Sequence, residues 1–222
     1  MRRLPRLIDM QVHAGPAGLE FEEQRVISLA LFTVFEPIRL WLREHDIRAP
    51  FRKLLVTLAD QDVFAKWHGQ VVNVGGVCEV TEAVSVASLK QNATDHTWVL
   101  GYVEHALQAV SNDLGWSSDE LWEHVRSLGK LPLPLVHFFD SMACVDPASG
   151  RRCVPWLSVR PDETLVGVRI GVRDVTLASA RGPLYVEVKL PFVRAELRGG
   201  AYRLLDRSGD VLASVSMDDE PM

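Results

Sequence analysis

The amino-acid sequence predicts an α+β fold in which a central pair of helices covers a C-terminal antiparallel sheet. Two observations favour this class. Residues 94–129 repeat apolar side chains at the spacing of amphipathic helices. From Leu135 onward, β-rich runs alternate with turn-forming segments, a pattern typical of an antiparallel meander. The residues before 94 mix strand and helix patterns, so we expect a mixed N-terminal half.

The N-terminal half begins with a predicted short strand at residues 4–13, where polar and apolar residues alternate imperfectly. Residues 25–35 are rich in β-branched and aromatic side chains, which favours a buried strand. The segment 29–31 leaves a helix open as the alternative. Pro37 suits the first turn of a helix, since its missing N–H is not needed there, and we expect this helix to end near Asp46.

Four short elements are predicted before the central helices. Residues 53–59 indicate a buried strand, and residues 60–69 indicate a short helix or an irregular loop. A strand pattern over 70–84 is broken by Gly75-Gly76, because paired glycines inside a strand pattern mark a bulge, a tight turn or a close backbone approach. Residues 85–92 then predict a short helix.

The central helices are predicted from their end signals and their apolar stripes. Thr94 or Asp95 can cap the first helix, and Gly115 can end it in a left-handed conformation. Ser117 and Glu120 have the spacing of a capping box for the second helix, and the short connection predicts an αα-hairpin. The apolar stripes that need a packing partner are Trp98, Val99, Tyr102, Val103, Ala106, Leu107 and Val110, followed by Leu121, Trp122, Val125 and Leu128.

The C-terminal part is predicted to consist of strands joined by turns. Pro132 and Pro134 form a stiff connector before it, which indicates a single domain over 1–222 with a soft internal boundary near 130–135. Beyond it, the strand candidates are residues 164–172, 184–193, 202–206 and 211–216.

Composition and charge exclude several classes of function. The 222 residues carry a net charge of −5, and the basic residues are scattered rather than gathered into the basic face typical of nucleic-acid binders. The longest apolar run, residues 26–35, is far shorter than the roughly 20 residues that span a bilayer. Charged residues near the N-terminus also interrupt its apolar stretch before that stretch reaches the length found in signal peptides. We therefore expect a cytoplasmic protein that binds neither nucleic acid nor membrane.

Two of the three cysteines are predicted to lie opposite each other. If residues 147–150 form a hairpin loop, Cys144 and Cys153 are equally far from it and become cross-strand neighbours. In a reducing cytosol we expect thiols that fill a small apolar space, and the alternative is a redox pair that forms a disulfide. Cys78 is interpreted as a core residue. Because no CxxC occurs, we expect no zinc site of the usual kind.

Catalytic and metal-ligating patterns are weak. Glu120 and His124 share a helical face, but neither helix carries the Glu-x-x-His of di-iron bundles, so capping or solvated side chains are the favoured interpretation. No metal and no cofactor are predicted. An enzyme remains the alternative, with His68, His137 and Asp140, or the Glu120/His124 pair, around a pocket.

The aromatic content favours a protein-binding function, since tryptophan and tyrosine anchor interfaces as readily as cores. The most concrete hypothesis is a bacterial protein that neutralises or regulates one partner protein, as immunity proteins of toxin pairs do. A subunit of a structural homo-oligomer is a further alternative, and the oligomeric state stays open. The predicted contact residues are Trp116, Glu120, Trp122 and Glu123 of the helical hairpin, together with Trp67 and His68.

Overall fold

The computed structural model describes residues 4–14, 19–61, 65, 71–131, 134–160, 163–181 and 192–217. Its helices and strands confirm the α+β class. The chain folds into two compact units, Met1–Leu135 and Val136–Met222, each of which has its own sheets. The division falls at the proline-containing connector. That the whole chain forms one domain stays a prediction.

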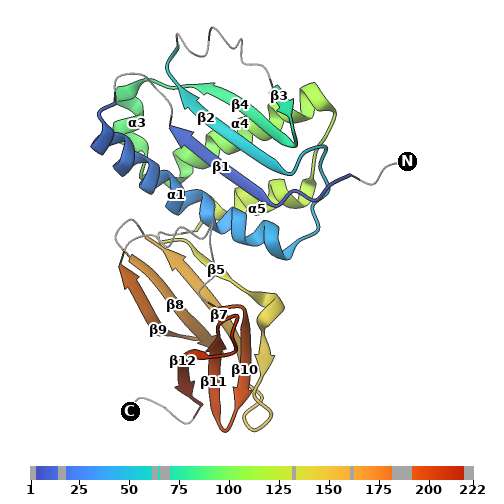
Figure 1. Cartoon of the computed structure of the whole chain (residues 1–222), viewed down its shortest axis with the longest axis vertical. Helices are drawn as coiled ribbons and strands as arrows, with labels where there is room; N and C mark the ends of the chain where they lie inside the picture. The colour runs from blue at the N-terminus through green and yellow to red at the C-terminus, as the bar shows by residue number, and fades with distance from the viewer. Residues whose placement is uncertain are drawn as a thin grey trace. The chain divides into compact units, whose positions relative to one another are not determined.

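A four-stranded sheet forms the centre of the first unit (Figure 1). Its strand order is β1-β2-β4-β3, with β1, β2 and β4 parallel and β3 antiparallel to β4. The predicted break at Gly75-Gly76 is the turn between β3 and β4, where both glycines have positive φ angles of 63° and 86°. The strands are β1 (Asp9–Ala14), β2 (Lys53–Ala59), β3 (Val71–Val74) and β4 (Val77–Ala83).

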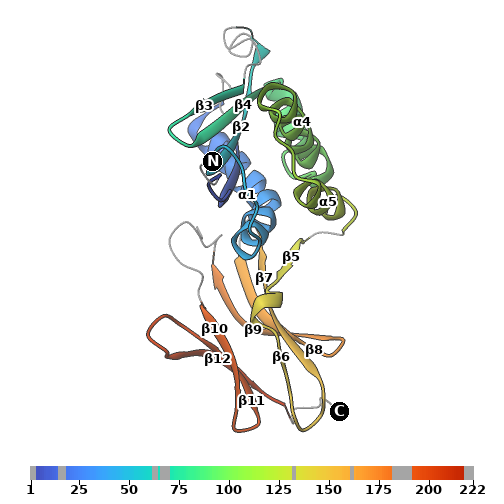
Figure 2. The same ribbon diagram turned by 90° about the vertical axis from the view of Figure 1, so that its right-hand side faces the viewer.

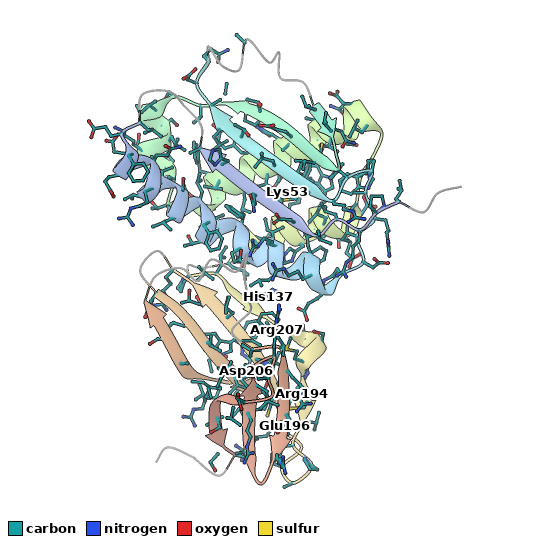
Figure 3. All side chains as sticks on the ribbon, in the orientation of Figure 1. Lys53, His137, Arg194, Glu196, Asp206 and Arg207 are labelled. Atoms are coloured by element: carbon teal, nitrogen blue, oxygen red, sulfur yellow. The ribbon has the colours of Figure 1, made fainter. Side chains whose placement is uncertain are left out.

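The two faces of this sheet differ in chemistry because side chains alternate along each strand. One face is apolar and buried, and its central residues are Met10, Val12, Leu54, Val56, Cys78 and Val80. The other face carries polar side chains that bond to one another. Lys53 donates from Nζ to Oε1 of Gln11 over 2.7 Å (Figure 3), and Thr57 donates from Oγ1 to Oε1 of Glu79 over 2.7 Å. Only the apolar face therefore needs a covering layer.

The prediction of a strand at residues 25–35 is wrong, because these residues belong to a single helix of 24 residues, α1 (Phe21–Glu44). A capping box between Glu20 and Glu23 starts the helix, and Pro37 lies inside it rather than at its beginning. The misleading signal has a physical cause. Residues on most sides of α1 are buried, so its sequence lacks the clear polar stripe by which a helix is recognised.

Helix α1 also buries an ion pair. Glu36 and Arg39 are 0% and 2% exposed, and Oε2 of Glu36 lies 2.8 Å from Nε of Arg39. Burial raises the pKa of Glu36 to about 7, although the guanidinium of Arg39 acts in the opposite direction. These two charged residues consequently do not mark the solvent side of the helix.

Three further helices follow the sheet: α3 (Val86–Asn92), α4 (His96–Leu114) and α5 (Asp119–Leu128). The side chain of Asp95 caps α4 by accepting hydrogen bonds from the backbone N–H groups of Thr97 and Trp98, and Gly115 ends the helix at φ 61°. The cap of α5 is Ser118, one residue after the predicted Ser117. The predicted αα-hairpin is thus present, with its boundaries set by local caps.

The hairpin covers a different sheet from the expected one. Helix α4 packs on β2, β3 and β4 and touches α1 and α5, whereas the sequence assigned the hairpin to the C-terminal sheet. Figure 2 shows α4 on one side of the four strands. The reason is the apolar face of the N-terminal sheet, which must be buried away from water. The strands of this sheet also lie close to α4 in the sequence.

The second unit consists of antiparallel sheets, as predicted for this part of the chain. The sequence did not predict the strand at 173–181, and residues 184–191 of one predicted strand lie outside the described residues. A first sheet contains β5 (Val136–Phe138), β6 (Cys144–Val145), β7 (Arg152–Val159), β8 (Glu163–Ile170) and β9 (Arg173–Arg181), and a second contains β10 (Arg194–Arg198), β11 (Ala201–Leu205) and β12 (Val211–Ser216).

Gly167 of β8 is expected to be essential for the packing of this unit. A Cβ atom there would lie 2.3 Å from Cζ2 of Trp156 and 2.3 Å from the carbonyl oxygen of Val175. Gly167→Ala should therefore lower the free energy of unfolding by about 1–3 kcal/mol. Denaturant unfolding of the whole chain measures this change. The matched control is Gly129→Ala, at φ −62° with no neighbour nearer than 3.6 Å, and equal stability of both variants would contradict the described packing.

Candidate functional site

Trp116, a predicted contact residue, is part of the core. Its side chain is 9% exposed, and its indole Nε1 donates a hydrogen bond of 2.7 Å to the carbonyl oxygen of Arg48. Its ring packs edge-on against Phe51 at a centroid distance of 5.2 Å. Trp116 therefore fixes the connection between α4 and α5 to the segment that follows α1.

The other predicted contact residues of the hairpin reach solvent. Trp122 is partly exposed and lies under the guanidinium of Arg126, whose Cζ is 4.9 Å from the ring centroid. Glu120 and Glu123 are exposed. Trp67 and His68 lie outside the described residues.

The burial of the two hairpin tryptophans predicts unequal effects on stability. Trp116→Ala removes a buried ring, so it should lower the free energy of unfolding by about 3–5 kcal/mol. Trp122→Ala removes a partly exposed ring and should cost under about 1 kcal/mol. Denaturant unfolding distinguishes the two. Equal losses would mean that Trp116 is not a core residue.

His124 joins α5 to α1 through an aromatic stack. Its imidazole lies 4.4 Å from the ring centroid of Trp41 at an interplanar angle of 9°, and His45 stacks on the same indole at 3.9 Å. Nε2 of His45 is also 3.8 Å from Oε1 of Glu120. The Glu120/His124 pair thus takes part in helix packing. Among the residues that the structure describes, no group of three or more His, Cys, Asp or Glu side chains is placed to hold a metal ion.

His137 and Asp140, which the enzyme alternative places in a pocket, each contact a neighbouring side chain of the second unit. His137 (Figure 3) is 6% exposed and packs edge-on against Phe139, at a centroid distance of 4.6 Å. Asp140 is exposed and accepts a hydrogen bond of 2.7 Å from Nη2 of Arg152. His137 thus has a packing contact and Asp140 an ion-pair contact, and these contacts do not indicate a shared catalytic role.

Cys144 and Cys153 are directly opposite each other on β6 and β7, in the register expected from the hairpin loop. Both are free thiols, as is the buried Cys78. Burial raises the pKa of Cys153 to about 11 and also raises the pKa of Cys144. Because the thiolate is the reactive form, both groups react slowly at neutral pH.

This geometry predicts a disulfide under forcing oxidation. Diamide should remove the free thiols of Cys144 and Cys153, leaving that of Cys78, without producing a dimer. Since few thiolates exist at pH 7, the rate should rise about tenfold for each pH unit up to pH 9. Thiol titration after denaturation and non-reducing electrophoresis measure this. Cys78→Ser is the control and should still lose two thiols; three thiols left free in the unmodified chain would rule the pair out.

The outer side of α4 carries a hollow of about 320 Å³ that the sequence did not predict. The ring centroids of Trp98 and Tyr102 are 4.8 Å apart at 73°, an edge-to-face arrangement, and both side chains remain partly exposed. The sequence placed both in the packing stripe of the helix. The buried stripe is instead formed by neighbours such as Val99 and Val103. The residues that line the hollow are Thr97, Trp98, Gly101, Tyr102 and His105.

Glu82 interacts electrostatically with two of the residues that line this hollow, Tyr102 and His105. Strand alternation puts it on the helix-covered face of β4, at the end of the series that begins with the buried Cys78 and Val80. Burial raises the pKa of Glu82, with His105 acting in the opposite direction. Burial and the carboxylate of Glu82 together raise the pKa of Tyr102. The three side chains therefore share one electrostatic neighbourhood.

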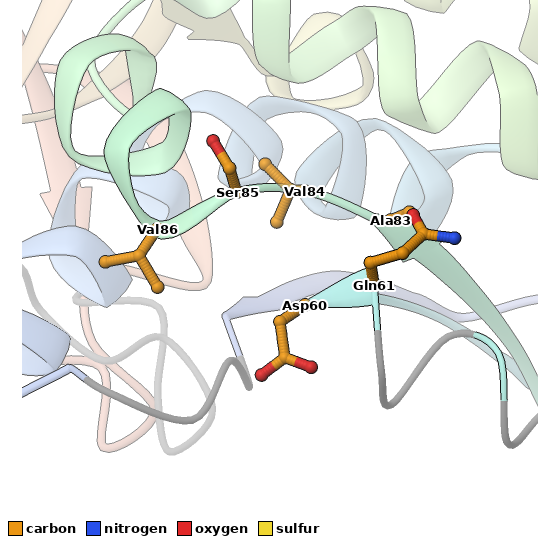
Figure 4. A pocket seen from close by; sticks show the side chains of 6 residues that line it. All are labelled: Asp60, Gln61, Ala83, Val84, Ser85 and Val86. Atoms are coloured by element: carbon orange, nitrogen blue, oxygen red, sulfur yellow. The ribbon is translucent and has the colours of Figure 1, made fainter.

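A second hollow, of about 440 Å³, lies at the carboxyl ends of β2 and β4 (Figure 4). The last backbone bond between these strands runs from the N–H of Val84 to the carbonyl oxygen of Ala59 over 2.7 Å, and beyond it the two chains separate. The hydroxyl of Ser85 caps α3 by accepting from the N–H of Ser88. Crevices at the carboxyl ends of parallel strands are common sites for small molecules. The lining residues are Asp60, Gln61, Ala83, Val84, Ser85 and Val86.

Comparisons with protein-family models, with curated proteins and with solved structures find no match for this chain. Within the described ranges, the helices lack the combination of length and apolar character needed to cross a bilayer. The assignment of function therefore depends on the geometry and chemistry of the two hollows.

Proposed function

We propose that this chain is a cytoplasmic protein that binds a partner protein and neutralises or regulates it, in the manner of an immunity or antitoxin protein. The observation that supports the proposal is the aromatic hollow on α4, formed by Trp98 and Tyr102. Tryptophan and tyrosine are among the residue types most enriched at the positions that dominate binding energy at interfaces. Their position beside a hollow offers a pocket into which a partner side chain fits.

The helix that carries this pair is held rigidly. Asp95 and Gly115 fix its two ends, and its inner face packs on the sheet through residues such as Val103, which is fully buried. A rigid helix loses little conformational entropy when a partner binds. The neighbouring helix α5 adds the partly exposed Trp122, and its Arg126 lies 3.7 Å from Oε2 of Glu104 on α4. The hairpin is thus a suitable binding surface.

A small-molecule enzyme is the second candidate, and the crevice in Figure 4 favours it. Its position at the ends of two parallel strands is where open sheets bind ligands. Asp60 and Ser85 supply a carboxylate and a hydroxyl there. Both hydrolytic chemistry and simple ligand binding use such groups. The purification experiment described next also tests this candidate.

The proposal predicts a stoichiometric protein partner. Tagged chain purified from its own cells should elute with one other protein in native mass spectrometry. Trp98→Ala combined with Tyr102→Ala should weaken the complex at least about 30-fold, since each of two central contacts contributes about 1 kcal/mol or more. Titration calorimetry with the purified partner measures this. Gln108→Ala, an exposed position on the same helix, is the matched control and should bind as the unmodified chain does.

Other outcomes would contradict the proposal. A lone chain that carries a small-molecule mass would favour the crevice and an enzyme. A homo-oligomer without a partner would favour a structural subunit. Circular dichroism must first establish that each variant is folded, because loss of binding in an unfolded variant says nothing about the surface.

A further inference from the structure

We propose that the hollow on α4 accepts a cationic side chain, arginine or lysine, from the partner protein, against the aromatic pair of Trp98 and Tyr102 and near the carboxylate of Glu82. This inference rests on the proposed function and specifies the chemistry of its binding site. It follows from the shape of the hollow, from its ring surfaces and from the charge next to it.

The shape suits a long side chain that enters end-on. Gly101 contributes no side chain, and a Cβ atom built there would meet no atom within 4 Å. One turn of helix separates Trp98 from Tyr102, and their rings stand at 73° to each other. The two rings contact each other edge to face, so they form one aromatic wall beside the open space at Gly101. The volume of about 320 Å³ is at the lower end of the range for ligand pockets and accommodates a single side-chain head group.

The aromatic rings of the hollow favour a cation. The faces of aromatic rings carry partial negative charge and attract guanidinium and ammonium groups, and tryptophan is the strongest of the aromatic side chains in this respect. The chain already makes this contact elsewhere, because Arg126 lies over Trp122 and Arg169 lies over Phe138 at 4.1 Å. At the α4 hollow, no such cation is among the lining residues in the described part of the chain.

The carboxylate of Glu82 also favours a cation in the hollow. Glu82 is partly buried, and within the described ranges no lysine or arginine pairs with it; His105 is the group that acts on its charge. A partly desolvated carboxylate without a fixed cation is destabilised as an anion, and an incoming cation relieves this cost. By contrast, Glu79 on the opposite face of the same strand accepts a hydrogen bond from Thr57. The net charge of −5 adds long-range attraction for a basic partner.

The test uses two short peptides as probes of the free chain. One is acetyl-Gly-Arg-Gly-amide, and the other replaces arginine by citrulline, which has nearly the same shape without the charge. Titrations are followed by the ¹⁵N-indole resonance of Trp98, assigned with Trp98→Phe. The arginine peptide should shift this resonance with saturation at millimolar concentration. The citrulline peptide should bind about tenfold more weakly.

Three variants separate the contributions to this binding. Glu82→Gln should weaken the arginine peptide about tenfold and leave the citrulline peptide unchanged, because only the charge is removed. Glu79→Gln, which removes a charge from the other face of β4, should have no effect. Gly101→Leu should abolish binding of both peptides while the helix stays intact, since its side chain enters open space. Equal affinity for both peptides, or no effect of Glu82→Gln, overturns the inference.

The partner complex distinguishes this inference from the proposed function. If Trp98→Ala with Tyr102→Ala weakens the complex but Glu82→Gln does not, the hollow holds an uncharged side chain, which overturns the inference and leaves the proposed function intact. If the arginine peptide binds as expected but no partner co-purifies, the proposed function fails and the inference fails as a statement about a partner. Loss of the complex in both variants supports both.

Discussion

The burial of a single face of the four-stranded sheet is the constraint on which the first unit depends. Alternation along β1, β2 and β4 gathers Met10, Leu54, Val80 and their neighbours on one side, which α1 and α4 cover. The same alternation directs Glu82, at the end of β4, toward α4. Glu82 is only partly exposed there, and its carboxylate raises the pKa of Tyr102 on the helix. The sheet therefore fixes the position of Glu82, whereas the residues that interact with its charge, Tyr102 and His105, are on helix α4.

Local signals in the sequence predicted much of the fold. The caps Asp95 and Gly115 and the turn at Gly75-Gly76 depend on a few adjacent residues, so they are readable without tertiary information. Helix α1 is different. It is buried around most of its circumference and even encloses Glu36 and Arg39, so neither apolar periodicity nor charge identified its solvent side. The packing partner of the hairpin depends on contacts between distant segments, which no local pattern contains.

The candidate site was harder to predict for a related reason. An apolar helical stripe tells which residues avoid water, but it does not tell where the covering layer ends. Trp116 and Trp98 are both aromatic residues of the hairpin region, yet one fills the core and the other borders a hollow. Trp116 packs against Phe51 and donates a hydrogen bond to the carbonyl oxygen of Arg48, whereas Trp98 lies outside the buried stripe of α4. The small residue Gly101 is the sequence feature that would have directed attention to the outer side.

Gly101 also carries a cost that bears on how this protein tolerates change. Glycine inside a helix is about 1 kcal/mol less favourable than alanine, and nothing in the packing of α4 prevents a methyl group at this position. A search for more thermostable variants of this chain would therefore find substitutions there early. Such variants would place a side chain in the hollow while improving the helix. Stability and an open hollow are thus opposing requirements at a single residue, and a stabilised version of this protein should be designed with that position held fixed.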